Sequence, residues 1–306
     1  MHPTSRRHND FESDTQVEVI IAPNAGACFG VVRAIKVGKK AIEKALASNE
    51  PIYSLGPLVH DPLVVTELSE KGLKIIGAPS EANRGTVVLR SHGIPEPEEA
   101  LLKKKKIQIA DATCPLVKKP QRIAKGLGVR GYFLIVVGDP NHPEVKGVLS
   151  YFAKPDFLVT YSAEKVSEIP ETVKRVGILA QTTIENRVFD SVVEAAKKRF
   201  QEVLQFNTIC DATSIRQTEA ETLSKKADVM VVVGGRNSSN TAKLVKICKA
   251  NKTATYHIET ASELQADWFR NKTKIGITGG AATPEEYVNF VGEEVSHLIH
   301  QSLNGH

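Results

Sequence analysis

Three stretches of the chain repeat the same order of apolar and polar positions. In each stretch a short apolar run of strand length ends in a polar turn, the turn contains a cysteine, and a helical pattern starts directly after it. A pattern that recurs at a near-constant interval with matching strand, turn and helix signals indicates an internal repeat. The apolar runs are Val17 to Ile21, Ile107 to Ala110 and Val203 to Phe206, and the cysteines are Cys28, Cys114 and Cys210.

Each repeat continues in the same way after its cysteine. In the middle repeat a helix is expected from Leu116 to Leu127, and an apolar strand from Tyr132 to Gly138 ends in the turn that holds His142 and Glu144. A second strand then ends at the turn of Thr182. Strands that alternate with helices predict α/β units with mostly parallel sheets, in which the polar turns gather at one edge. Around a pseudo-threefold axis, the three edges would face one centre.

These repeats divide the chain into three predicted α/β lobes. The first residues are polar and lack the apolar core of a signal peptide, so they are expected to form a disordered tail. The predicted boundaries are a tail over residues 1–16, lobes over 17–106, 107–202 and 203–298, and a second tail over 299–306.

The composition is that of an ordinary globular protein. The 306 residues are 41% hydrophobic and 25% charged, and 40 Lys and Arg residues against 35 Asp and Glu residues leave a net charge of only +5. This excess is too small to indicate nucleic-acid binding. No apolar run approaches the roughly 20 residues that span a bilayer. We therefore expect a cytoplasmic protein with no membrane span and no nucleic-acid partner.

The four cysteines narrow the possible chemistry. In a chain of this kind they argue against disulfides and leave metal binding, redox chemistry or burial. Cys248 lies on the apolar face of an amphipathic helix and is expected to be a buried structural thiol. The other three lie at predicted helix N-termini, where unpaired N–H groups and the helix dipole favour a thiolate.

Three thiolates from three lobes can hold one tetrahedral metal ion or one iron–sulfur cluster. Zinc held by three cysteines usually takes a fourth protein ligand, and structural zinc favours Cys-x2-Cys pairs, which the chain lacks. A cubane cluster normally takes four cysteines, so three would leave one iron with an open coordination position. On spacing alone, a third interpretation stays open, in which the cysteines are buried at equivalent core positions of the repeat.

The turns after the strands carry groups suited to an anion. Imidazoles, hydroxyls, an amide and the N–H groups of a helix N-terminus together form a cradle for phosphate. Glu144 is the one carboxylate expected inside this pocket, where it could pass protons. A glutamate at a helix start can instead simply interact with the helix dipole. The cradle residues are His60, His92, His142, Ser238, Ser239 and Asn240.

Several short motifs, taken in order, are similar to those of one enzyme family. The chain resembles the 4-hydroxy-3-methylbut-2-enyl diphosphate reductases, the LytB or IspH family, over nearly all of residues 17 to 298. The motifs are Ala25 to Val31 with Arg33 to Ile35, Val59 to Asp61, Ser91 to Gly93, Asp111 to Val117, His142 to Val145, Gln181 to Thr183, Cys210 to Thr213 with Arg216 and Gln217, and Asn237 to Asn240.

The resemblance implies a clover of three α/β lobes around a [4Fe–4S] cluster. Cys28, Cys114 and Cys210 would hold the cluster and leave one iron open to the allylic hydroxyl of the substrate. The implied reaction is a reductive dehydroxylation, in which two electrons and two protons remove that hydroxyl as water. It gives isopentenyl diphosphate and dimethylallyl diphosphate, as the last step of the methylerythritol phosphate route to isoprenoids. Reduced ferredoxin or flavodoxin would supply the electrons.

The same resemblance assigns roles to the polar turns. The substrate's diphosphate would lie among the six cradle residues, and Glu144 would supply protons while Thr182 and His142 position water, the substrate hydroxyl and the glutamate. The chain departs from the family at Ala282, where a serine usually contacts the diphosphate. Either Thr283 or backbone N–H groups would have to replace the missing hydroxyl, or substrate use would differ.

Two other functions stay open at this point. A non-redox hydro-lyase would use the cluster only as a Lewis acid, and a non-catalytic cluster sensor or phosphate-binding relative would keep the fold without the reaction. The alanine at position 282 favours a function that differs from that of the family, whereas the presence of Glu144 and Thr182 favours retained catalysis.

Overall fold

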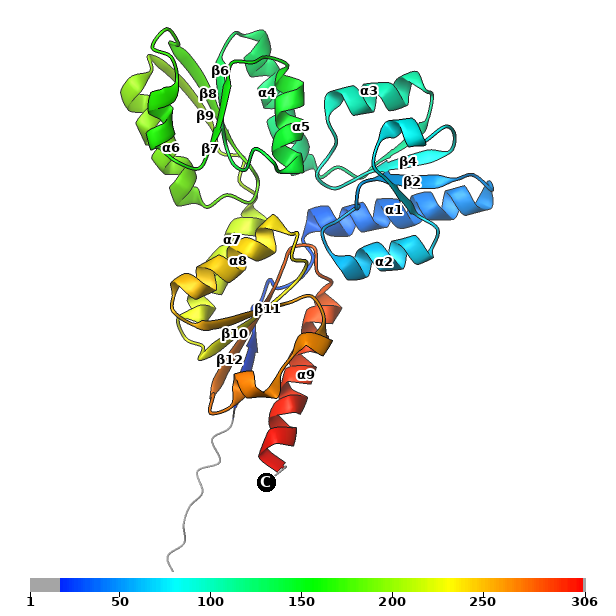
Figure 1. The fold of residues 1–306 in the computed structure, drawn as a ribbon, viewed down its shortest axis with the longest axis vertical. Coiled ribbons are helices and arrows are strands. Elements are labelled where there is room, and N and C mark those ends of the chain that lie inside the picture. Colours follow the sequence, from blue (N-terminus) through cyan, green and yellow to red (C-terminus); the bar gives the residue numbers. More distant parts are fainter. Residues whose placement is uncertain (1–16, 305–306) are drawn as a thin grey trace, which may run out of the picture.

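Three four-stranded parallel sheets, each covered by helices, surround a common centre in the computed structural model, which describes residues 17–304 (Figure 1). We refer to each sheet with its helices as a lobe. The three parallel sheets confirm the predicted α/β class with three lobes. The tail expected over residues 1–16 lies outside the described residues.

The first lobe follows the first cysteine. Its sheet has the strand order β3-β2-β4-β5. The strands are β2 (Ile52–Leu55), β3 (Lys74–Ile76), β4 (Thr86–Leu89) and β5 (Gln108–Asp111), and the helices are α1 (Phe29–Ala47), α2 (Pro62–Glu70), α3 (Glu96–Lys104) and the short 3-10 helix η1 (Pro79–Glu81).

The second lobe has the equivalent strand order β7-β6-β8-β9. The strands are β6 (Phe133–Val137), β7 (Phe157–Thr160), β8 (Arg175–Ala180) and β9 (Glu202–Phe206), and the helices are α4 (Pro115–Val129), α5 (Pro143–Phe152), α6 (Asn186–Arg199) and the 3-10 helix η2 (Glu164–Glu168).

The third lobe joins the two ends of the described chain, because its strand order is β1-β12-β10-β11. The strands are β1 (Glu18–Ile21), β10 (Val229–Val233), β11 (Ala254–Ile258) and β12 (Lys274–Gly279), and the helices are α7 (Asp211–Ser224), α8 (Ser239–Ala250), α9 (Glu285–Asn304) and the 3-10 helices η3 (Ala261–Glu263) and η4 (Ala266–Phe269).

The chain changes lobe at each of the three special cysteines. Strands β5 and β9 end the first and second lobes and lead into Cys114 and Cys210, and β1 belongs to the third lobe and leads into Cys28. Each pairs inside its own sheet, β5 with β4, β9 with β8 and β1 with β12. In the first two lobes this follows from the short helical crossovers β4–α3–β5 and β8–α6–β9, which place consecutive parallel strands side by side. The first two lobes were predicted to end at residues 106 and 202. Their sheets each include one more strand, β5 up to Asp111 and β9 up to Phe206.

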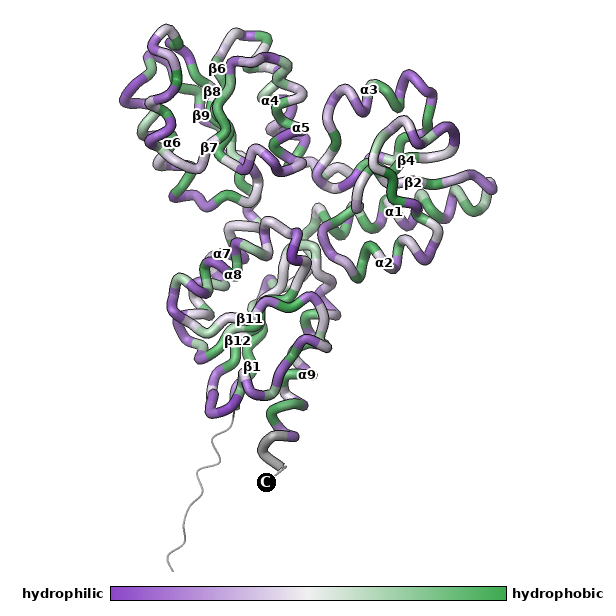
Figure 2. Tube along the Cα trace, in the orientation of Figure 1, coloured by the Kyte–Doolittle hydropathy of each residue, from purple (hydrophilic) through white to green (hydrophobic). Residues whose placement is uncertain are grey.

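The apolar pattern explains where the cores lie. Strand β10 reads Val-Met-Val-Val-Val and is buried along its whole length, as expected for a central strand covered on both faces. Figure 2 shows hydrophobic residues gathered along the strands of each lobe and hydrophilic residues along the outer turns. Helix α9 continues past residue 298, where the third lobe was expected to end, and Ile299 is buried in the core of that lobe. None of the helices in residues 17–304 is long and apolar enough to cross a membrane.

Candidate active site

The three cysteines occupy equivalent positions at the centre. Each is the N-cap residue of the helix that opens a lobe, in α1, α4 and α7. Each also donates its backbone N–H, at 2.9 Å, to a carbonyl in the turn that follows β12, β4 or β8. The bonds are Cys28 to Ala281, Cys114 to Ser91 and Cys210 to Thr182.

The side chains of these cysteines face one cavity and lie near one another. A Cβ atom added at Gly30 would lie 2.7 Å from the Sγ of Cys114 and 3.8 Å from the Sγ of Cys28, so a side chain there would collide with a sulfur. Burial raises the pKa of the Cys114 thiol, and the sulfurs of the other two cysteines act in the same direction. The helix N-terminus lowers this pKa through the N–H groups of Leu116 and Val117, as expected, but burial outweighs it.

Three imidazoles form a compact group on the wall of the same cavity. The ring centroids of His60 and His92 are 4.4 Å apart, those of His92 and His142 are 5.8 Å apart, and those of His60 and His142 are 6.4 Å apart. Burial lowers the pKa of all three, well below the usual value for His92 and to about 4 for His142. The three rings are therefore neutral at pH 7, and an anion bound among them would favour their protonation.

A hydrogen bond at His142 determines which ring nitrogen carries the proton. Its Nδ1 accepts the backbone N–H of Glu144 at 3.2 Å and caps α5, so the neutral ring carries its proton on Nε2. Ser238 caps α8 in the same way in the third lobe. In the first lobe the equivalent cap is Asp61. His60 therefore lies one residue before the position that matches His142.

Glu144 is buried at the cavity and held by one residue. Its side chain is only 1% exposed. One carboxylate oxygen accepts the backbone N–H of Thr182 and the other accepts the Thr182 hydroxyl, both at 2.7 Å. Burial raises the pKa of Glu144 to about 7, against the lowering effect of the two bonds from Thr182. A carboxyl group with this pKa can hold and release a proton near neutral pH.

The loop before α8 brings the remaining predicted contacts to the cavity. Ser239 and Thr183 share a hydrogen bond between their hydroxyls at 2.9 Å, which joins the third lobe to the second. Asn240 is 5% exposed, yet neither its amide nitrogen nor its amide oxygen has a partner within residues 17–304. An unpaired buried amide at a cavity wall is suited to a ligand that supplies both an acceptor and a donor.

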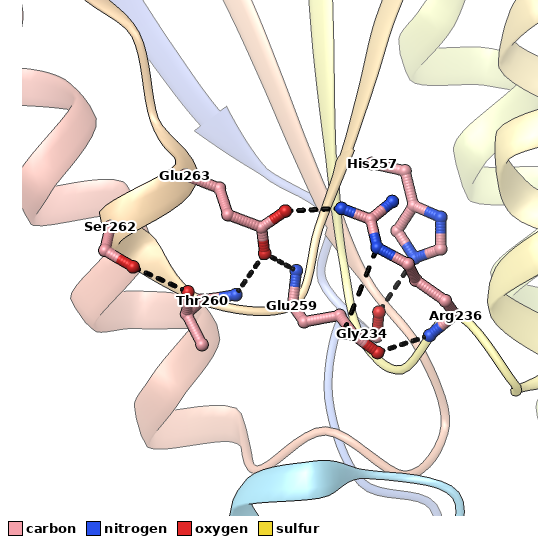
Figure 3. Close-up of polar contacts among 7 residues, drawn as sticks. All are labelled: Gly234, Arg236, His257, Glu259, Thr260, Ser262 and Glu263. Atoms are coloured by element: carbon pink, nitrogen blue, oxygen red, sulfur yellow. Dashed lines mark hydrogen bonds and ion pairs between the residues drawn. The ribbon is translucent and has the colours of Figure 1, made fainter.

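A polar network supports this loop from the outer side (Figure 3). Arg236 donates its backbone N–H to Glu259 at 2.7 Å, and its guanidinium forms an ion pair with Glu263. The ring of His257 bonds the carbonyl of Gly234 at 2.8 Å. Gly234 has a φ of +144°, which side chains rarely tolerate, so the glycine allows the strand to turn into the loop.

Ala282 lines the cavity, whereas Thr283 does not provide the missing hydroxyl. The Thr283 side chain is buried and donates to the carbonyl of Val233 at 3.4 Å, and it also bonds the carboxylate of Asp61. Of the two replacements considered from the sequence, the structure therefore leaves the backbone N–H groups.

One cavity is lined by all twelve residues predicted from the sequence. Thr183, Ser91 and Thr213 also line it and were missed, although all three belong to the short motifs already noted. Cys248 is fully buried elsewhere, in the core of the third lobe, as expected. The predicted residues around the cavity are Cys28, Cys114, Cys210, His60, His92, His142, Glu144, Thr182, Ser238, Ser239, Asn240 and Ala282.

The arrangement of the thiols bears on the group they could hold. Within residues 17–304, no set of three or more His, Cys, Asp or Glu side chains is arranged to hold a metal ion. Three sulfurs that approach one cavity from three helix N-termini fit an anionic group, since the helix dipoles and N–H groups there favour negative charge.

Comparison with known proteins identifies the family. The family model described as LytB protein matches residues 19–296. The chain belongs to the LytB protein family. A relative from Geobacter sulfurreducens named 4-hydroxy-3-methylbut-2-enyl diphosphate reductase is 41% identical over 282 residues, which is 92% of this chain and 98% of the relative. A relative of the same name from Aquifex aeolicus is 40% identical over 289 residues, covering 94% and 99% of the two chains.

Two solved structures of LytB relatives agree with the fold. The structure of the E-1-hydroxy-2-methyl-but-2-enyl-4-diphosphate reductase from Plasmodium falciparum is 28% identical with a TM-score of 0.81, over 90% of this chain and 86% of that one. A structure of an (E)-4-hydroxy-3-methyl-but-2-enyl diphosphate reductase, described as the terminal enzyme of the non-mevalonate pathway, is 41% identical with a TM-score of 0.65, over 94% and 100%.

Proposed function

We propose that this LytB protein is a 4-hydroxy-3-methylbut-2-enyl diphosphate reductase. Family membership and the names of relatives that match over nearly their whole length support this activity. The substrate's allylic C–O bond breaks, two electrons and two protons are taken up, and the hydroxyl leaves as water. Depending on which carbon receives the proton, the product is isopentenyl diphosphate or dimethylallyl diphosphate, as in the last step of the methylerythritol phosphate route.

Cys28, Cys114 and Cys210 would hold a [4Fe–4S] cluster. Their sulfurs face one cavity, and Gly30 leaves the space between two of them free of a side chain. When bound, such a cluster supplies electrons one at a time and an open iron site that acts as a Lewis acid.

The diphosphate would bind against the histidine group and the start of α8. His142, whose proton is on Nε2, and the orphaned amide of Asn240 would each offer a donor. The hydroxyls of Ser238 and Ser239 and the N–H groups of the α8 N-terminus complete the anion site. Ala282 would contribute backbone contact alone.

The observation that carries the proposal is the Glu144–Thr182 pair beside the three cysteines. The carboxyl group is buried, is held at both oxygens, and has a pKa raised by burial to about 7. It is thus a proton donor positioned where a departing hydroxyl needs a proton. Thr182 orients Glu144, and His142 holds the backbone of Glu144 through its Nδ1.

We also propose reduced ferredoxin or flavodoxin as the electron donor, because the reaction consumes electrons that the substrate does not carry. A cytoplasmic location is proposed too, since all four cysteines are free thiols and reducing compartments keep them so.

One anaerobic experiment tests the activity. Protein reconstituted with iron and sulfide and reduced chemically should consume (E)-4-hydroxy-3-methylbut-2-enyl diphosphate and release both five-carbon diphosphates. Loss of the substrate without added reductant would indicate a hydro-lyase instead. A loaded and reduced protein that leaves the substrate unchanged would refute the proposal.

A further inference from the structure

Arg216 is a buried arginine without a carboxylate partner. It lies in α7, soon after Cys210, and is only 6% exposed. Among residues 17–304 it forms no ion pair, and the nearby carboxylate of Glu219 is occupied by the backbone and side chain of Asn24. A buried guanidinium is costly unless negative charge lies close to it, so this position needs an explanation.

Two of the three guanidinium nitrogens hold the cysteine segments together. Nη1 donates to the carbonyl of Ala212 at 2.8 Å, and Nη2 donates to the carbonyl of Gly26 at 2.7 Å. Ala212 lies two residues after Cys210 and Gly26 lies two residues before Cys28. The group is therefore fixed between the helix of one cysteine and the loop of another.

The third nitrogen has no partner. Nε is buried and makes no hydrogen bond within the described residues. The charge of Arg216 interacts with the sulfurs of Cys28 and Cys210. Burial lowers the pKa of the guanidinium, while these sulfurs and the Glu219 carboxylate raise it. An anionic group held by the cysteines would provide both the missing hydrogen-bond acceptor and the missing counter-charge.

We propose that Arg216 is a fixed cation that stabilises the negative charge of the cluster held by the three cysteines and raises its reduction potential. The inference rests on the proposed function only in requiring an iron–sulfur cluster at the cysteines. A positive charge stabilises the reduced form, which carries one more electron, more than the oxidised form. Hydrogen bonds and charges around the ligands are among the features by which proteins tune such potentials.

Arg33 provides a matched control. In α1 it donates to the carbonyls of Thr113 at 3.1 Å and Asp111 at 3.3 Å, so it holds the loop of Cys114 as Arg216 holds that of Cys28. Arg33 is only half-buried, and its Nε is not among the buried atoms that lack a partner. The two arginines therefore share the carbonyl contacts and differ in the buried, partly unpaired charge.

The test compares Arg216→Gln, Arg216→Lys and Arg33→Gln after anaerobic reconstitution. Iron and sulfide content is measured first, and the midpoint potential follows from a redox titration monitored by electron paramagnetic resonance. We expect Arg216→Gln to shift the potential to more negative values, Arg216→Lys to shift it less, and Arg33→Gln to shift it least.

Every outcome of this test bears on the proposal. An unchanged potential in Arg216→Gln, or an equal shift in Arg33→Gln, would overturn it. If Arg216→Gln fails to load a cluster, loading of Arg216→Lys would support a need for the charge. Failure of both variants would show that a positive charge is not sufficient without the two carbonyl contacts, and would overturn the proposal. The potential is measured without substrate, so an inactive but cluster-loaded wild type would refute the reductase activity and leave this test intact.

Discussion

Replacing Glu144 by glutamine should remove the proton donor while leaving the site's geometry intact. The glutamine side chain differs from that of Glu144 by one amide nitrogen, so its carbonyl oxygen can still accept the N–H of Thr182. The Thr182 hydroxyl can rotate and accept from the new amide instead of donating. General acids typically contribute about 10²–10⁴-fold to turnover. We expect a loss of kcat in that range for Glu144→Gln, with the cluster and substrate binding retained.

The same residue predicts the pH dependence of the wild type. The active form of a proton donor is protonated, and the pKa of Glu144 is raised to about 7. The kcat/KM should therefore be constant below pH 7 and fall about tenfold for each pH unit above it. The three histidines should not produce this change, because burial moves their pKa values down, away from it.

Anaerobic steady-state kinetics between pH 5.5 and 9 with a small reducing dye would check this prediction, with those pH limits chosen to span about two units on either side of neutrality. The substrate's phosphate also titrates, with a pKa of about 6, so the residual activity of Glu144→Gln serves as the control that shares this ionisation. A flat wild-type profile through neutral pH would refute the assignment of Glu144. So would the same fall in the glutamine variant, or a loss of turnover below about tenfold.

Three further predictions concern other parts of the centre. Serine replacement of any one of the three cavity cysteines should abolish iron loading, whereas Cys248→Ser should load fully, because that thiol is buried in a lobe core; iron and sulfide analysis checks this. Ala282→Ser should lower KM modestly at nearly constant kcat, since an added bond to the diphosphate would serve ground and transition states alike; a wild type that ignores this substrate beside an active serine variant would contradict the assigned substrate. Lys243 of α8 forms an ion pair with Glu185 of the second lobe at 3.4 Å and so helps to hold the start of α8 at the cavity. Lys243→Met should therefore raise KM about two- to fivefold at constant kcat. Lys246→Met, at an exposed position of the same helix, should leave KM unchanged.

The sequence predicted the three-lobed architecture, the three cysteines and the six cradle residues because they follow from local patterns, whereas Ala282 and the role of Thr182 came from the family resemblance. Strand, turn and helix signals recur after each cysteine, and the polar turns of parallel sheets meet at their carboxyl ends. The pairing of strands was harder to predict from the sequence. The apolar run before Cys114 looks like the start of a new lobe, but a helical crossover from β4 places it as the edge strand of the first.

Properties that depend on burial also lay beyond the sequence. The raised pKa of Glu144 follows from its complete burial, and no pattern of neighbours along the chain reveals that. The direction of the Thr283 hydroxyl is set by the carbonyl of Val233, far away in the chain. Arg216 could be noted as part of a motif, whereas its unpaired Nε is visible only in three dimensions.

The pairing of β1 with β12 has a consequence for how the protein is made. The first and second lobes are continuous stretches of chain, so each can fold as soon as it has left the ribosome. The third lobe cannot, because its edge strand β1 precedes the other two lobes in the chain, whereas the neighbouring strand β12 follows them. Until β12 has been made, β1 has no partner strand, and an unpaired strand edge is prone to wrong association. Cys28, which follows β1, is brought to the other two cysteines only when β1 has paired with β12. A cofactor held by all three thiols could therefore be inserted only after β12 has been made.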